Sequence, residues 1–187
     1  MKKIGITGSI ASGKTTASKI LARGKYPLFS ADNEVKKLYR NKDFKDLILN
    51  KFKIKKTLII KQILKKKILD NKSNLKKLEK IIHPFVRKEM RKFKVKNKKK
   101  KFVFFEIPLL VESKLMKKFD IVIFIKAKTD LRLKRFISKG GNKKLFQILN
   151  KKQLSDKKKE KHSDYVVVNE KNKIILKKRL LDIVKKL

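Results

Sequence analysis

The sequence predicts an α/β fold in which helices cover both faces of a five-stranded parallel sheet. Two features predict it: five short runs rich in Ile, Val, Phe and Tyr, typical of strands buried on both faces, and the helical patterns that separate them. With 187 residues, 41% of them hydrophobic, the chain is long enough for one domain with a substantial core. The predicted strands are Lys3–Thr7, Tyr26–Ser30, Phe102–Glu106, Ile121–Lys126 and Tyr165–Asn169.

The first predicted strand runs into a loop of the pattern G-x-x-x-x-G-K-T at residues 8 to 15. Its glycines let successive backbone N–H groups face phosphate oxygens, and the helix that follows, Thr15–Ala22, adds the positive end of its dipole. Lys14 places an ammonium on the outer phosphates, and Thr15 can ligate the Mg²⁺ that accompanies them. Because strand, loop and helix follow in this order, we favour a triphosphate site over an ordinary glycine turn. The loop residues assigned to the nucleotide are Gly8, Ser9, Ile10, Ala11, Ser12, Gly13, Lys14, Thr15 and Thr16.

The long stretch between the second and third predicted strands is predicted to be helical. The first helix is expected to stop at Gly24, which suits a C-terminal cap. Residues 33 to 100 show apolar positions three or four apart and no strand pattern. We interpret them as a helical insertion on the core and as a natural place for an acceptor site. The predicted helices are Asn33–Tyr39, Asp43–Phe52, Ile60–Leu69 and Asn74–Arg91.

A second insertion, about Phe136 to Lys161, follows the fourth predicted strand and carries Gly140-Gly141 and many lysines. A mobile basic segment there could close over phosphates as a lid; the alternative is a plain pair of surface helices. The tail, Ile174–Leu187, is an amphipathic helix expected to pack on the sheet. The weak apolar stripe of the insertion consists of Leu145, Ile148 and Leu149.

Two carboxylates lie at the ends of predicted strands, at the sheet edge where ligands of open α/β sheets bind. Asp32 is placed to accept the proton of an acceptor hydroxyl that attacks the γ-phosphate, although aspartate there also suits the N-cap of a helix from Asn33. Glu106 suits the holding of a magnesium-bound water beside Thr15, or else pairing with one of the many lysines. The strand ends therefore offer a candidate base and a candidate metal ligand.

His83 and Arg87 form a further candidate pair on one predicted helix. His83 could be a hydrogen-bond donor in a substrate pocket, or a helix cap before a helix that starts at Pro84. Arg87, one turn further on, could bind an anionic group.

The formal net charge of +41 suggests a polyanionic partner. However, only seven of the 57 basic residues are arginine, the side chain favoured for base-specific readout, and lysine is spread over the whole chain. We therefore interpret the charge as a solvated lysine coat and expect no nucleic-acid partner; the run Lys98–Lys101 is expected in a loop between a helix and a strand. The absence of cysteine excludes disulfides and thiolate sites, and no apolar run is long enough to span a bilayer. The expected location is cytoplasmic.

Several segments together resemble one family. They occur in order over nearly the whole chain: GSIASGKT at residues 8–15, SAD ending at Asp32, IIHPFVRKEM at 81–90, EIPLLVES at 106–113 and SDYVVVN at 163–169. In this combination the chain resembles the dephospho-coenzyme A kinase family. The resemblance implies ATP-dependent phosphorylation of the ribose 3′-hydroxyl of dephospho-coenzyme A, the last step of coenzyme A synthesis. It also implies a fold like the nucleoside monophosphate kinases, a three-layer P-loop kinase fold.

The resemblance also implies a division of the single domain, residues 1–187, and roles for its residues. The core would comprise residues 1–32, 101–135 and 162–187, the helical acceptor region about 33–100 and the lid about 136–161. Asp32 matches the catalytic base, with Lys14 as its partner in catalysis, and Ala11 through Thr16 match the ATP loop. The acceptor is expected to contact Asp32, His83, Arg87, Pro108, Leu109, Leu110 and Glu112.

The chain departs from the family pattern at three places. Ser30 replaces the first aspartate of Asp-Ala-Asp, and Lys139-Gly140 stands nearest to the usual Arg-Asp pair of the lid. Arg132 stands where glutamine is usual, whereas Arg135 matches a family arginine. Arg135 and Lys139 are therefore the expected cations beside ATP.

Two other functions remain as alternatives. The same loop would serve a kinase for another small hydroxyl acceptor, such as a nucleoside or nucleotide. A nucleic-acid-binding ATPase or nucleotide switch is disfavoured, because no D-x-x-G occurs and the sequence at 150–153 lacks the final aspartate of N-K-x-D. The expected partners are ATP with Mg²⁺ and dephospho-coenzyme A, and the expected state is a monomer.

Overall fold

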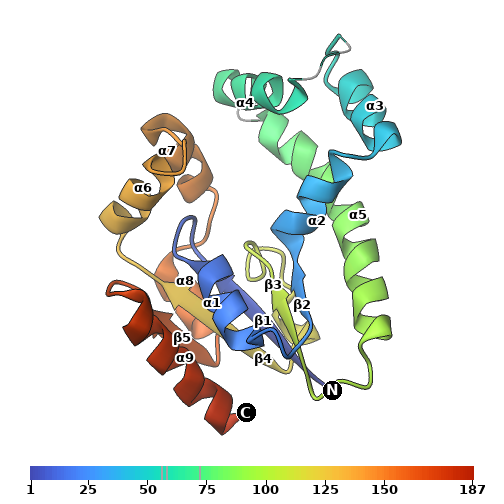
Figure 1. The fold of residues 1–187 in the computed structure, drawn as a ribbon. Coiled ribbons are helices and arrows are strands. Elements are labelled where there is room, and N and C mark those ends of the chain that lie inside the picture. Colours follow the sequence, from blue (N-terminus) through green and yellow to red (C-terminus); the bar gives the residue numbers. More distant parts are fainter. Residues whose placement is uncertain (56, 58, 72) are drawn as a thin grey trace. The chain divides into compact units, whose positions relative to one another are not determined.

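The computed structural model describes residues 1–55, 57, 59–71 and 73–187 (Figure 1). These residues divide into two compact units, Met1–Ser30 with Phe93–Leu187 and Ala31–Lys92. The strands are β1 (Lys2–Gly8), β2 (Leu28–Ser30), β3 (Phe102–Glu106), β4 (Ile121–Lys126) and β5 (Tyr165–Val168). The helices are α1 (Lys14–Ala22), α2 (Ala31–Leu38), α3 (Lys42–Lys51), α4 (Ile60–Asp70), α5 (Ser73–Lys96), the 3₁₀ helix η1 (Met116–Lys118), α6 (Thr129–Ile137), α7 (Lys143–Lys151), α8 (Asp156–Lys161) and α9 (Lys173–Lys186).

The first unit contains the sheet, in which all five strands are parallel in the order β2-β3-β1-β4-β5 (Figure 1). In its register, Glu106 at the end of β3 lies opposite Ile6 of β1 and Ser30 of β2. Because the strands are parallel, the loop after β1 and the carboxylate of β3 share the carboxyl edge of the sheet. This confirms the α/β fold expected from the five apolar runs.

Helices lie on both faces of the sheet, which gives three layers. On one face α1 and α9 contact each other and cover the strands (Figure 1). On the opposite face, the rings of Phe29, Phe93 and Phe105 lie with centroids 5.5 to 5.9 Å apart, and Phe93 brings the last turns of α5 onto the sheet. The fully buried residues of the first face are Ile4, Ile6, Ala17, Leu21, Phe104, Ile123, Ile125 and Leu180.

The predicted limits are wrong where proline and turn geometry intervene. The second strand was expected from Tyr26, but β2 begins at Leu28, because the amides of Lys25 and Tyr26 both bond to the Ala22 carbonyl and Pro27 has no N–H to donate. The C-cap of α1 is Arg23, with φ of 51°, rather than Gly24. The limits of β3 and β4 agree with those predicted.

In its described residues the second unit contains helices, turns and irregular segments but no strand, as predicted for this part of residues 33 to 100. It comprises α2, α3, α4 and α5 as far as Lys92. The apolar positions three or four apart are indeed buried: Phe44, Ile48, Leu49, Phe52, Ile60, Leu64, Ile68, Leu75 and Leu78.

The structure excludes two local alternatives in this unit. α2 begins at Ala31, so Asp32 lies in the first turn of the helix, where its charge suits the helix dipole, and not at an N-cap before Asn33. His83 does not cap a new helix either, since Pro84 lies inside the continuous helix α5. Proline removes one N–H donor from the interior of α5.

The region between β4 and β5 belongs to the first unit and forms α6, α7 and α8. The ring of Phe136 lies 5.7 Å from that of Phe146, and the Arg132 guanidinium lies over the same Phe146 ring. Phe146 and Ile148 are the buried residues of α7, whereas Leu145 and Leu149 of the predicted stripe are half-buried. Ile148 of the predicted stripe is therefore buried, whereas Phe146, which the stripe did not include, is buried as well.

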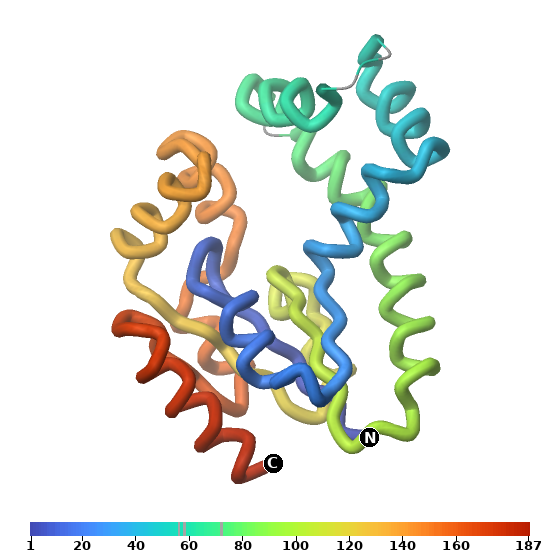
Figure 2. Tube along the Cα trace, viewed as in Figure 1, coloured from blue at the N-terminus to red at the C-terminus, as the bar shows by residue number. Residues whose placement is uncertain are grey.

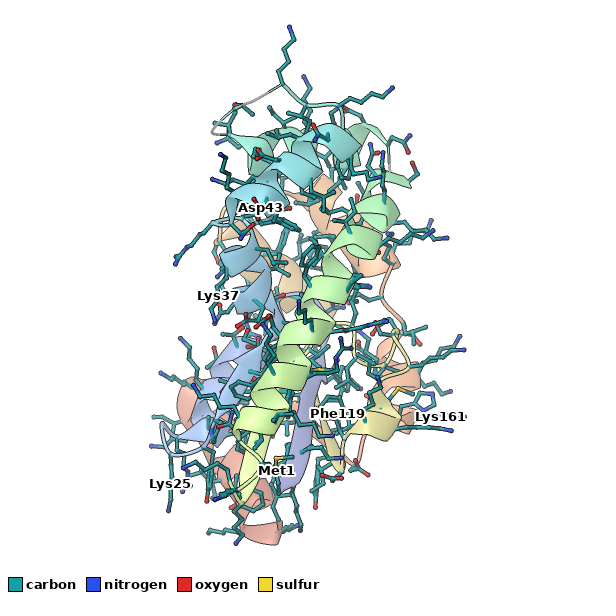
Figure 3. All side chains as sticks on the ribbon, turned by 90° about the vertical axis from the view of Figure 1, so that its right-hand side faces the viewer. Met1, Lys25, Lys37, Asp43, Phe119 and Lys161 are labelled. Carbon is teal, nitrogen blue, oxygen red and sulfur yellow. The ribbon has the colours of Figure 1, made fainter. Side chains whose placement is uncertain are left out.

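The surface agrees with the predicted lysine coat. Lys25, Lys37 and Lys161 point away from the ribbon in Figure 3, as do the many other side chains tipped with nitrogen. The run at 98–101 lies between α5 and β3, as expected. Both termini belong to the first unit (Figure 2), and Lys2 Nζ donates to the Leu187 carbonyl at 2.7 Å. Of the helices in the described part of the chain, none has the length and apolar character that crossing a bilayer requires.

Candidate active site

The loop at residues 8 to 15 connects β1 to α1 and has the backbone that a phosphate-binding loop needs. Gly13, the N-cap of α1, has φ of 96° and Ala11 has φ of 57°. A Cβ at Gly13 would lie 2.2 Å from Asn169 Nδ2, and a Cβ at Gly8 would lie 2.6 Å from the Ile125 carbonyl oxygen. Both glycines of the motif are therefore required by close approach, and Gly13 also by its positive φ.

Lys14 is buried within this loop despite its charge, with 8% exposure. Its Nζ donates to the Ser9 carbonyl at 3.1 Å, and the Ser12 amide donates to the same carbonyl. The ammonium thus lies across the loop, as expected of the lysine that meets the outer phosphates.

Thr15 and Glu106 lie together at the carboxyl edge of the sheet. Thr15 Oγ1 donates to Glu106 Oε1 at 2.5 Å. Glu106 is 1% exposed, and its Oε2 is buried with no hydrogen-bond partner among the described residues. A hydroxyl and a carboxylate with an unsatisfied oxygen are hard donors of the kind Mg²⁺ takes when phosphates and water supply the remaining ligands. The donor set therefore fits Mg²⁺, although no cluster of three or more His, Cys, Asp or Glu occurs in the described ranges.

The loop after β3 carries the predicted residues Pro108, Leu109, Leu110 and Glu112. The Pro108 carbonyl accepts from Thr7 Oγ1 at 3.2 Å, which fixes this loop to the end of β1. Leu110 is fully buried, whereas Leu109 is half-buried. Glu112 Oε1 accepts from the Leu154 amide at 3.0 Å and pairs with Lys159 Nζ at 3.0 Å.

The cations of α6 differ in their surroundings. Arg132 is 4% exposed and donates to the Ala127 carbonyl, to Thr129 and to Asn150; burial lowers the pKa of its guanidinium. Arg135 is half-buried, and its Nη1 donates to the Asn169 carbonyl at 3.1 Å, while Lys139 is exposed. Arg132 therefore fastens α6 to α7, and Arg135 lies beside the phosphate-binding loop through Asn169.

Sequence reasoning missed four residues that contact this loop. Asn169 Nδ2 donates to the Ser12 carbonyl at 2.8 Å, and Gln153 Oε1 accepts from the Ile10 amide at 2.8 Å. Asp156 Oδ1 accepts from Ser9 Oγ at 2.7 Å, and Lys159 Nζ donates to Ser9 Oγ at 3.4 Å. Asn169 could have been found, because it directly follows β5 at the carboxyl edge; the other three had no local signal.

Asp32, His83 and Arg87 belong to the second unit. Asp32 is exposed and follows the last residue of β2 by two positions. His83 is half-buried; burial lowers the pKa of its imidazole, with Glu79 opposing and Arg87 adding to the shift. Arg87 is exposed. This unit thus offers an exposed carboxylate, an exposed guanidinium and a half-buried imidazole whose pKa is lowered.

A phosphate-binding loop at the carboxyl edge of a three-layer parallel sheet, with its Thr15 bonded to a strand-end carboxylate, is the arrangement of a P-loop kinase. The family model of dephospho-CoA kinase matches residues 2–174. A dephospho-CoA kinase of Bartonella henselae is 33% identical over 192 residues, which cover 100% of this chain and 98% of the relative. The chain therefore belongs to the dephospho-CoA kinase family and is a kinase.

Two solved structures resemble the fold. TT1252 from Thermus thermophilus has a TM-score of 0.79 at 25% identity, with 100% of this chain and 97% of that chain covered. Dephospho-CoA kinase from Campylobacter jejuni has a TM-score of 0.68 at 26% identity, with the same coverage of 100% and 97%. The three-layer P-loop kinase fold is thus that of the family.

Proposed function

We propose that the protein transfers the γ-phosphoryl group of ATP to the ribose 3′-hydroxyl of dephospho-CoA, which gives CoA and ADP in the last step of CoA biosynthesis. The observation that carries the proposal is the family match over residues 2–174, a range that includes the complete phosphate-binding loop, Asp32 and Glu106.

The nucleotide site is proposed to be the loop from Gly8 to Thr16. Its inward amides and the Lys14 ammonium neutralise the charge of the phosphates. Mg²⁺, when it is bound with ATP, adds positive charge at the β- and γ-phosphates. Thr15 and Glu106 would hold it, because Glu106 Oε2 is buried and lacks a hydrogen-bond partner among the described residues.

Asp32 is proposed to be the general base. The 3′-oxygen of the acceptor attacks the γ-phosphorus, its proton passes to Asp32, and the bond to the β–γ bridging oxygen breaks with both electrons leaving on ADP. Its exposure and its position just after β2 support this role, since a base must be reachable by an acceptor from solvent. Arg135, directly before the lid, and Lys139, within the lid of residues 136–161, would neutralise the transferring phosphoryl group.

The helical region, residues 33–100, is proposed to receive the acceptor. Within the second unit, α2, α3 and α5 line a hollow of about 510 Å³, large enough for part of an organic ligand. His83, Arg87 and the segment Pro108–Glu112 are proposed to contribute further contacts to the acceptor. The apolar side chains that line the hollow are Leu38, Phe44, Leu47, Phe85 and Val86.

A coupled ADP-release assay tests this function. Dephospho-CoA should be phosphorylated in preference to nucleosides and nucleoside monophosphates at equal concentration, and Lys14→Ala should lose most turnover. Preference for a nucleoside, or ATP hydrolysis that requires RNA or DNA, would reject the proposed acceptor. A monomeric state and a cytoplasmic location are part of the same proposal; size-exclusion chromatography tests the first and cell fractionation the second.

A further inference from the structure

Two lysines are buried among the described residues, and both contact Ser9 of the phosphate-binding loop. Lys14 donates to the Ser9 carbonyl at 3.1 Å, whereas Lys159 Nζ lies 3.4 Å from Ser9 Oγ. Lys159 is 0% exposed and lies on α8, 150 residues away in sequence. Burial of an ammonium is costly unless it is paired, so the position of Lys159 requires an explanation.

Lys159 is paired with a carboxylate of the loop after β3. Its Nζ lies 3.0 Å from Glu112 Oε1, and the same oxygen accepts from the Leu154 amide at 3.0 Å. One ammonium therefore contacts two loops at the carboxyl edge, the one after β1 through Ser9 and the one after β3 through Glu112.

The neighbours of Lys159 hold the same loop. Asp156, one turn earlier on α8, accepts from Ser9 Oγ at 2.7 Å, and Gln153 accepts from the Ile10 amide at 2.8 Å. A hydroxyl has one proton to donate, so Ser9 donates to Asp156 and can accept from Lys159. The hydroxyl of Ser9 is thus fixed in direction by two charged groups of opposite sign.

We infer that Lys159 is a positioning residue for ATP binding: its ammonium, neutralised by Glu112, holds Ser9 so that the amides of the loop face the phosphates. This inference rests on the proposed nucleotide site. A nest of backbone amides is sensitive to small displacements, because each N–H must point at a phosphate oxygen. A lysine that only fastened α8 would affect stability and leave ATP affinity unchanged.

The test is a double-mutant cycle on the dissociation constant of Mg·ATP, measured by calorimetry on the full chain without acceptor. Lys159→Met should weaken ATP binding about tenfold. This is less than the roughly hundredfold loss that a ~1 Å misplacement of a functional group can cause. Lys157→Met, an exposed lysine on the same helix, is the matched control and should change it by less than about twofold. In a Ser9→Ala background, Lys159→Met should add less than about twofold, because Lys159 acts through Ser9.

An effect of Lys159→Met that is equally large with and without the Ser9 hydroxyl would overturn the inference. So would a folded Lys159→Met protein that binds ATP as the unaltered chain does. If Lys159→Met does not fold, because the largely buried Glu112 loses its ammonium partner, the comparison is made in a Glu112→Gln background, where no carboxylate is left without that partner. Glu112→Gln/Lys159→Met should then bind ATP about tenfold more weakly than Glu112→Gln, and equal affinity refutes the role of Lys159. A chain that binds ATP but does not phosphorylate dephospho-CoA would reject the proposed function alone.

Discussion

Gly13→Ala is the substitution whose consequence the structure defines most sharply. Gly13 has φ of 96°, and an added Cβ would lie 2.2 Å from Asn169 Nδ2. That amide donates to the Ser12 carbonyl at 2.8 Å and is buried. Alanine at 13 must therefore adopt an unfavourable φ and also displace the Asn169 amide.

The two costs can be added. A positive φ costs an L-residue about 1–2 kcal/mol, and loss of the Asn169 hydrogen bond costs about 0.5–1.5 kcal/mol. The free energy of unfolding should thus fall by about 1.5–3.5 kcal/mol. Gly140→Ala isolates the first cost, because Gly140 has φ of 80° and nothing lies within 4 Å of its added Cβ. Gly140→Ala should therefore lose only about 1–2 kcal/mol.

Urea denaturation followed by circular dichroism measures these differences. In an Asn169→Ala background the hydrogen bond is already absent, so Gly13→Ala should cost no more than Gly140→Ala does. The reasoning is refuted if Gly13→Ala and Gly140→Ala cost the same in the unaltered chain, or if removal of the Asn169 side chain does not reduce the cost at position 13.

Four further predictions concern the proposed site. Asp32→Asn should lower kcat by about 10²–10⁴-fold with an unchanged urea midpoint, and near-normal kcat would remove the general-base role. Glu106→Gln should raise the Mg²⁺ concentration for half-maximal activity about tenfold in a magnesium titration; an unchanged value would exclude Glu106 as a metal ligand. Arg135→Lys should lower kcat more than Lys139→Met, because only a guanidinium can bind a phosphoryl group with two parallel hydrogen bonds, and steady-state kinetics would expose the opposite order. Burial lowers the pKa of His83 below its ordinary value of 6.5, so the unfolded chain binds the proton more readily; stability from this group is present above pH 6.5 and is lost as the pH falls toward the folded-state pKa. Urea denaturation should show a smaller loss over that range in His83→Gln, and an equal loss would assign the pH dependence to other groups.

Local patterns predicted the sheet well and the helical region less well. The limits of β3 and β4 were predictable because each is an unbroken apolar run bounded by charged residues. Such a run is typical of a strand that is buried on both faces of a parallel sheet. The length of β2 was overestimated. The Tyr26 amide donates to the Ala22 carbonyl in the turn after α1, and Pro27 has no N–H to donate to a neighbouring strand. The alternative that His83 caps a helix starting at Pro84 is excluded, because Pro84 lies inside the continuous helix α5 and the preference of proline for the first helical turn does not hold there.

In the candidate site, too, the residues of local motifs were predictable and those placed by long-range contacts were not. Lys14, Thr15 and Glu106 were predictable, because a contiguous motif and a strand end place them at the carboxyl edge. Gln153, Asp156 and Lys159 reach that edge through α7 and α8, whose position depends on contacts with residues far away in the chain. The bond between Ser9 and Asp156 spans 147 positions, and periodicity within a short window carries no information about it.

In a chain with 57 basic residues, burial distinguishes Lys14 and Lys159 from the lysines that coat the surface. Water surrounds an exposed lysine and screens its charge, so the lysine coat adds little at any one phosphate. Lys14 and Lys159 have been removed from water, and in a medium of lower dielectric their fields reach the loop with less screening. The cost of burying Lys159 is offset by Glu112, which leaves the neutralised pair to orient Ser9, while Lys14 lies within the loop itself. A new lysine placed on the exposed face of α8 should therefore not restore ATP affinity to Lys159→Met, although it restores the net charge; recovery by such a surface lysine would show that bulk charge, and not the position of one buried ammonium, governs nucleotide binding.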